Sequence, residues 1–271
     1  DMGGTTASNT SGSITSSVRA NTTYGQSIVT YTGSGSDATV GTGLTQTPDL
    51  VITKRRTSPY EWWIVWHSAI SNNDGDWGAF NRTDGWRIGG EAMYDASGFT
   101  SSTFGVRGGA SGVNVNGATQ VSYCFHDVAG YSKFGSYSGT GGTHTITTGF
   151  APAFVMIKRT DDNTTGNWTM WDNTRNPNNP VTQMLRANTD GVEETKTDRE
   201  PSFLSTGFSI GDSDSDTNAS GGNYIYAAFA DTREYAYWLD QSGNNNDWTS
   251  EGGLTESDVM VDSPTNNFAT L

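Results

Sequence analysis

Aspartates in the second half of the chain have the spacing of a metal-binding loop. In Asp212-Ser-Asp-Ser-Asp-Thr-Asn218, carboxylates recur at alternate positions, and Ca²⁺ binds about six to eight such oxygens. Thr217 replaces the glycine that an EF-hand loop needs at its sixth position, and Asn223 stands where its bidentate glutamate would be. The sequence therefore favours a solvated hairpin loop. A Ca²⁺ site at Asp212, Asp214 and Asp216 is the alternative.

A tryptophan-rich stretch offers different chemistry, the stacking of sugar rings. In Glu61-Trp-Trp-Ile-Val-Trp-His67, strand alternation would place Trp62, Ile64 and Trp66 on one face. Both faces are aromatic or apolar, which is typical of a central strand buried on both sides. The alternative is an exposed glycan platform, because indole combines a flat apolar surface with an N–H donor. This platform would consist of Trp62, Trp66, Trp77 and Trp86.

No catalytic motif stands out. The 29 Asp and Glu residues make carboxylate pairs inevitable and therefore uninformative. There is no Gly-x-Ser-x-Gly elbow and no His-Glu-x-x-His motif. His67, His126 and His144 have no histidine at the corresponding positions of the internal repeat described next. We therefore expect no enzymatic activity, no catalytic residue and no required cofactor. The single cysteine, Cys124, is expected to be a buried apolar residue.

The elements that position these residues are duplicated. Thr47-Pro-Asp-Leu-Val-Ile-Thr-Lys-Arg-Arg56 corresponds to Ala151-Pro-Ala-Phe-Val-Met-Ile-Lys-Arg-Thr160. Each is an apolar run that follows a proline and ends in basic residues, which predicts a buried central strand. Further matches follow in one order at an offset of 104 to 106 residues: Tyr31 and Tyr137, Trp63 and Trp168, Phe104 and Phe208, Asn114 and Asn218, Gly117 and Gly221, and Phe125 and Phe229. This offset indicates a duplicated domain.

Short aromatic strands between glycine-rich turns predict an all-β fold of two tandem antiparallel β-sandwiches, of jelly-roll or concanavalin-like lectin kind. Strands are expected at 27–31, 38–40, 49–54, 62–67, 77–81, 103–106 and 120–125, and again at 133–137, 143–147, 153–158, 167–171, 182–187, 207–210 and 223–229. The predicted organisation is an N-terminal arm or linker at 1–23, repeats at 24–131 and 132–235, and a C-terminal connector at 236–271.

Two residue sets follow from the duplication. Phe104, Phe125, Phe208 and Phe229 are predicted core residues, because each recurs within a strand of both repeats. Lys54, Arg55, Lys158 and Arg159 are predicted to form exposed charge pairs at strand ends.

Charge and composition argue against nucleic-acid binding, a membrane span and disorder. A net charge of −14 disfavours nucleic acid, whose phosphates need a basic surface. Apolar residues make up 33% of the chain, and no run approaches the roughly 18 apolar residues of a membrane span. An aromatic content of 11% argues against disorder.

Four stretches carry a resemblance to a known family. They are Tyr123-Cys-Phe125, Gly130-Tyr-Ser-Lys-Phe-Gly-Ser-Tyr-Ser-Gly139, Phe154-Val-Met-Ile-Lys-Arg159 and Asn223-Tyr-Ile-Tyr-Ala-Ala-Phe-Ala230. They resemble large tail-fibre or tail-associated virion proteins of tailed phages, and Ser263-Pro-Thr-Asn-Asn-Phe-Ala-Thr-Leu271 is similar to a connector in those proteins. The resemblance implies a structural role in the virion or outside the cell and supplies no catalytic motif.

The leading hypothesis is a structural component of a phage appendage that acts in assembly and in host-surface attachment. Its partners would be other virion subunits, further copies of the chain and a cell-surface glycan. The alternatives are a carbohydrate-binding adhesin module and the subunit of an extracellular filament. Because residues 1–23 and 236–271 lie outside the duplication, they are expected to contact neighbouring chains or modules.

Overall fold

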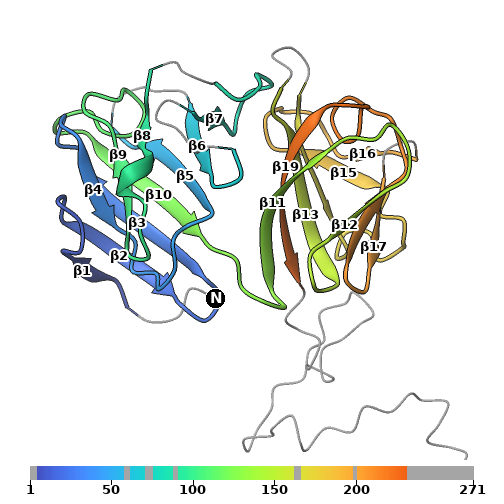
Figure 1. Ribbon diagram of the computed structural model, residues 1–271, viewed down its shortest axis with the longest axis horizontal. Helices are drawn as coiled ribbons and strands as arrows, with labels where there is room; N and C mark the ends of the chain where they lie inside the picture. Colours follow the sequence, from blue (N-terminus) through green and yellow to red (C-terminus); the bar gives the residue numbers. More distant parts are fainter. Residues whose placement is uncertain are drawn as a thin grey trace, which may run out of the picture. The chain divides into compact units, whose positions relative to one another are not determined.

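The computed structural model describes residues 5–57, 62–70, 76–87, 91–161, 166–197 and 200–230 (Figure 1). Four antiparallel sheets form two sandwich-like bodies, which confirms the predicted all-β class. Residues 1–230 form one compact unit. The connector predicted at 236–271 lies outside the described residues. Among those residues, no helix is long and apolar enough to cross a membrane.

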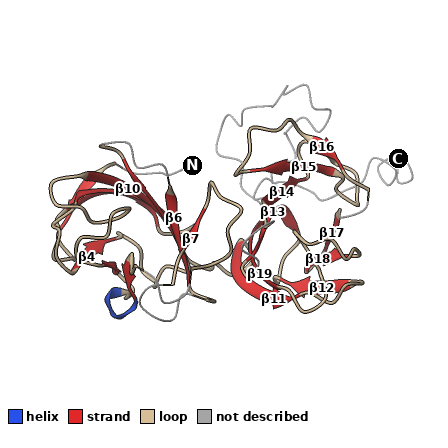
Figure 2. Cartoon of the chain, turned by 90° about the horizontal axis from the view of Figure 1, so that it is seen from above, coloured by secondary structure: helices blue, strands red, loops and turns tan. Residues whose placement is uncertain are grey.

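The first sandwich pairs a seven-stranded sheet with a three-stranded one. The larger sheet has the order β1 (Ala7–Asn9), β2 (Ser16–Asn21), β3 (Gln26–Thr32), β10 (Thr119–Phe125), β5 (Leu50–Arg55), β6 (Trp63–His67) and β7 (Gly78–Ala79). The smaller sheet has the order β4 (Ala38–Gly41), β9 (Thr103–Val106) and β8 (Tyr94–Asp95), followed in the chain by the 3-10 turn η1 (Ala96–Gly98). Figure 2 shows β10 and β4 on opposite sides of this body.

The second sandwich repeats this plan. Its larger sheet has the order β11 (Ser132–Ser138), β19 (Asn223–Ala230), β13 (Pro152–Arg159), β14 (Trp168–Asp172), β15 (Gln183–Arg186) and β16 (Glu194–Thr195). The smaller sheet has the order β12 (His144–Thr147), β18 (Gly207–Ile210) and β17 (Pro201–Leu204). Each strand expected from the sequence has a counterpart in one of the two sandwiches.

The strand register supports the duplication. Val51 of β5 lies between Cys124 of β10 and Trp66 of β6. Val155 of β13 lies between their counterparts Ala228 and Trp171. All six side chains are buried in the core of their own sandwich. The two Val-rich strands therefore occupy the same place in both bodies.

A buried asparagine closes the same loop in each repeat. Asn114 Nδ2 donates to the carbonyls of Ser36 and Arg107 at 2.7 and 3.0 Å, and its Oδ1 accepts from the Ser34 amide at 2.8 Å. Asn218 makes the equivalent bonds to Gly142, Asp212 and Thr140 at 2.6, 2.8 and 2.9 Å. Three residues later the chain turns with a positive φ of 74° at Gly117 and 76° at Gly221, which glycine adopts without strain.

The four phenylalanines predicted to be core residues differ in how deeply they are buried. Phe104 and Phe208 are fully buried between the sheets of their sandwiches. Phe125 and Phe229 are partly buried and project from the opposite face of β10 and β19, because the adjacent residues Cys124 and Ala228 occupy the inward positions. Both pack against the third apolar cluster described next, so they are core residues of that cluster, though less deeply buried than Phe104 and Phe208.

These outer faces meet in a third apolar cluster that joins the sandwiches. We call it the inter-sandwich cluster. Its buried members are Leu50, Val65, Trp86, Phe134, Met156, Trp168, Ile225 and Ala227. Polar contacts reinforce it: the Trp86 amide donates to the Thr160 carbonyl at 2.7 Å, and Trp168 Nε1 donates to the Ala79 carbonyl at 2.9 Å.

Lys158 lies at the same junction. Its Nζ donates to the Thr83 carbonyl of the first sandwich at 2.9 Å and also to the Gly166 carbonyl. The side chain is fully buried, so the prediction of an exposed strand-end charge is wrong for Lys158. Residues 79–86 of the first sandwich cover it, a contact that the local sequence of β13 does not reveal.

The N-terminal segment belongs to the first sandwich. β2 pairs with β3 along its whole length and β1 pairs with β2. Ser16 Oγ donates to the Gly41 carbonyl at 3.0 Å, and Ile14 bridges to Val40 of the other sheet. The expectation of an arm at residues 1–23 therefore fails for residues 7–21, because an edge strand needs backbone pairing more than apolar side chains.

Candidate binding surface

The four tryptophans expected to form a glycan platform do not share an exposed surface. Trp66 is buried and stacks on Phe99 with ring centroids 3.7 Å apart. Trp77 is buried and its Nε1 donates to the Glu91 carbonyl at 2.8 Å. Trp86 is buried in the inter-sandwich cluster. Residues 64–67 of β6 are buried on both faces, as the sequence favoured, whereas Trp63 at its start and Trp62 just before it are partly buried. Because Trp66, Trp77 and Trp86 are buried, they form no exposed platform.

Trp62, the fourth member, is partly buried and covered by cations. The guanidinium groups of Arg82 and Arg87 lie 4.9 and 5.0 Å from its ring centre. Both arginines also bind Asp84, at 2.8 and 3.3 Å, and the hydrogen bond from Arg82 lowers the pKa of that carboxyl. The arginines occupy the ring face that a sugar would need.

The three aspartates form turns rather than a cation cage. Asp212 Oδ1 accepts from the Asp214 amide at 2.7 Å and from Thr217 Oγ1 at 2.8 Å. Asp214 Oδ1 accepts from the Asp216 amide at 2.8 Å. Asp216 accepts from the amide and side chain of Asn167 at 3.0 and 2.9 Å. Within the described part of the chain, no three His, Cys, Asp or Glu side chains are grouped to hold a metal.

The histidines and the cysteine lie apart. Burial of His67 lowers its imidazole pKa to about 4. Burial raises the pKa of the Cys124 thiol to about 12, so this side chain stays protonated. His126 is buried with Nδ1 2.7 Å from the Asp127 carbonyl, and His144 packs edge-on against Tyr137. These side chains form no common site.

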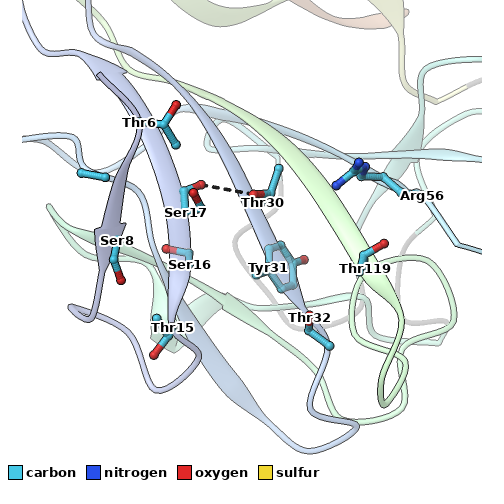
Figure 3. A pocket seen from close by; sticks show the side chains of 11 residues that line it. Thr6, Ser8, Thr15, Ser16, Ser17, Thr30, Tyr31, Thr32, Arg56 and Thr119 are labelled. Atoms are coloured by element: carbon cyan, nitrogen blue, oxygen red, sulfur yellow. Dashed lines mark hydrogen bonds between the residues drawn. The ribbon is translucent and has the colours of Figure 1, made fainter. Parts of the chain in front are cut away.

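A groove of about 380 Å³ lies along the outer face of the N-terminal strands (Figure 3). β1, β2, β3 and β10 supply most of its wall, and Arg56 follows β5 directly. Hydroxyl side chains dominate it. The lining residues are Thr6, Ala7, Ser8, Thr15, Ser16, Ser17, Thr30, Tyr31, Thr32, Arg56 and Thr119. Its volume lies in the range of small-ligand sites, roughly 300–1,000 Å³.

The groove continues into a basic and aromatic surface. Lys54 pairs with Trp63 across β5 and β6, and its Nζ lies 5.9 Å from the indole centre. Trp63 stacks on Tyr123 with centroids 6.3 Å apart and planes 26° apart. Arg19 lies opposite Ile28, whose other neighbour is Tyr123. Strand alternation puts these side chains on the outer face.

We call this surface the basic face and define it as Arg19, Lys54, Arg56, Trp63 and Tyr123 together with Ser17, Thr30, Thr32 and Thr119. The spans of β2, β3, β10, β5 and β6 contain no Asp or Glu, although the whole chain contains 29. Five neighbouring strands without a carboxylate make this region locally positive.

Sequence reasoning did not identify the groove. The usable signals are Thr30-Tyr-Thr32, which alternates hydroxyl and buried positions, and the basic run Lys54-Arg-Arg56. Apart from Thr119 of β10, the remaining lining residues come from 6–17, a segment whose composition is typical of a linker.

Comparison with known proteins adds a family but no function. The model of one family, described as Domain of unknown function (DUF7483), matches residues 1–233, and the chain belongs to that family. No curated protein and no solved structure matches the chain.

Proposed function

We propose that this member of the DUF7483 family is a structural component of a phage virion appendage, a tail fibre or similar part. In this role it holds neighbouring virion subunits, including further copies of itself, and supports attachment to the host surface. Support comes from the resemblance of four sequence stretches to tail-associated virion proteins and from the way the two sandwiches are joined.

The junction is the observation that carries the structural role. Tandem domains move relative to one another unless their interface is large and apolar. Here Phe80 packs on Trp168 with ring centroids 5.1 Å apart, and Phe125 packs on both Phe134 and Phe229 at 6.0 Å. Such aromatic contacts and the backbone bonds beside them resist sliding of one body on the other. A unit of this kind is suited to transmitting position and load.

The proposal is tested on purified phage particles that encode this sequence. Peptide mass spectrometry of the tail fraction should recover the chain in a fixed ratio to other tail proteins. Negative-stain images after labelling with an antibody to the second sandwich should place it on an appendage. Absence of the chain from washed particles, with recovery from the infected-cell lysate, would overturn the proposal.

A further inference from the structure

The two sandwiches use the same Lys-Trp pair differently. In the second sandwich, Lys158 and Trp168 donate to the carbonyls of Thr83 and Ala79, and both side chains are buried. In the first sandwich, the corresponding Lys54 and Trp63 are partly exposed. The outer face that packs against a neighbouring domain in one repeat is thus partly open in the other.

The open surface also has parts that the second repeat lacks. Among the described residues, β1 and β2 have no counterpart in the second sandwich. These strands supply Ser8 and Ser17 to the groove, and Thr6 and Thr15 directly precede them. Arg56 is exposed, whereas its counterpart Thr160 is buried and bonds to the Asn223 carbonyl at 3.1 Å. A cationic, hydroxyl-lined groove therefore exists in the first sandwich, and the described residues of the second sandwich do not reproduce it at the corresponding place.

We propose that the basic face binds acidic saccharides, sugar chains that carry carboxylate, sulfate or phosphate groups. The Arg56 guanidinium binds the anionic group, since its planar fork matches such oxygens. The hydroxyls of Ser17, Thr30, Thr32 and Thr119 exchange hydrogen bonds with sugar hydroxyls. This inference names the ligand class for the proposed host-surface attachment and rests on it.

Charge sets the selectivity for anionic sugars. The chain carries −14 overall, so its general field repels acidic polymers and only a local cationic surface can hold them. Attraction across such an exposed surface falls off over about 10 Å at 0.1 M salt. Binding should therefore weaken as salt is raised, and a neutral sugar chain without an anionic group should bind far less.

Calorimetric titration of the full 271-residue chain provides the test. The probes are polygalacturonate for carboxylate, dextran sulfate for sulfate, a phosphorylated mannan for phosphate, and unmodified dextran as the neutral control. Binding of at least one acidic polymer and not of dextran is expected, and the polymer that binds identifies the anionic group. Equal binding of dextran, or no binding of any acidic polymer, overturns the inference. Single-stranded DNA is titrated as a further probe, and tighter binding of it than of the acidic polymers also overturns the inference.

Variants place the binding site on the surface. Arg56→Gln with Lys54→Gln should weaken binding about tenfold or more, because charge-assisted contacts to the anion are lost. Lys133→Gln with Lys196→Gln is the matched control: it also removes two positive charges, from β11 and from a loop of the second sandwich, where these side chains pair with Asp127 and Glu194. The assignment would be refuted if the control lost as much affinity as the Arg56→Gln, Lys54→Gln variant, or if that variant bound as tightly as the unchanged chain. Failure here would leave the particle-localisation test of the structural role unaffected.

Discussion

Lys158 and Trp168 of the second sandwich lie beneath residues of the first, whereas Lys54 and Trp63 of the first lie on a half-open surface. The strands and the register around both pairs are the same. The difference lies in the side-chain contacts: Lys158 Nζ and Trp168 Nε1 donate to the carbonyls of Thr83 and Ala79, whereas the Trp63 ring stacks on Tyr123 beside Lys54. Duplication of one fold has thus produced two outer faces that both contribute to the inter-sandwich cluster, but the Lys-Trp pair is buried on one and partly exposed on the other.

The largest expected effect is at the covered tryptophan. Trp168→Ala removes a buried indole and its bond to Ala79, and should lower the free energy of unfolding by about 3–5 kcal/mol. Trp63→Ala removes a partly exposed ring and should cost about 1–2 kcal/mol. Urea unfolding of both variants measures the contrast. Equal costs would mean that the two positions are equally buried.

The lysines should show the same contrast at smaller scale. Lys158→Ala leaves the Thr83 and Gly166 carbonyls without this donor and should cost about 3 kcal/mol. Lys54→Ala should cost about 0–1 kcal/mol, the range of exposed charge contacts. Thermal melts of both variants compare them, and a Lys158→Ala protein as stable as Lys54→Ala would contradict the buried location.

Acid should expose a further difference, at His67. Its counterpart in the second repeat is Asp172. Burial depresses the folded-state pKa of His67 to about 4, below the unfolded value of about 6.5. The stability that neutral His67 provides is therefore complete above about pH 6.5 and decreases as pH falls toward 4, by roughly 2–3 kcal/mol. Urea unfolding at pH 7, 5.5 and 4 measures it, with His67→Asn as the comparison. An unchanged pH slope in His67→Asn would assign the loss to other groups.

The smallest contrast is expected between the two loop asparagines. Asn114→Ala and Asn218→Ala each remove three hydrogen bonds to the backbone. Each should cost about 1–3 kcal/mol, and the two costs should agree within about 0.5 kcal/mol. Chemical unfolding of the pair gives both values. A large disagreement would show that the two loops are not equivalent.

Much of the fold could be predicted from the sequence, because the duplication fixes which residues share a place. Val51 and Val155 illustrate this, since each lies in an apolar run with the period of a strand. β2 could not be predicted in this way: Ser16-Ser-Val-Arg-Ala-Asn21 is paired by its backbone and carries few apolar side chains.

The burial of side chains between the two sandwiches could not be predicted from the local sequence either. Strand alternation predicts on which side of the sheet Lys158 and Phe229 project. It does not predict which side meets the other sandwich, because that depends on tertiary contacts from residues 79–86 and β5. The tryptophans of the expected platform were misjudged for the same reason, because aromatic residues suit a core as well as a binding surface. The groove depends on a segment whose polar composition resembles a linker.

The inter-sandwich cluster has a consequence for biosynthesis. The first sandwich is complete once Phe125 has been made, but the cover over Leu50, Val65 and Trp86 is complete only when β19, the last strand of the second sandwich, emerges about 100 residues later. At roughly 5–20 residues per second, translation leaves this apolar surface uncovered for about 5–20 s. A chain cut between the repeats would expose it permanently, so that each half would tend to aggregate when expressed alone.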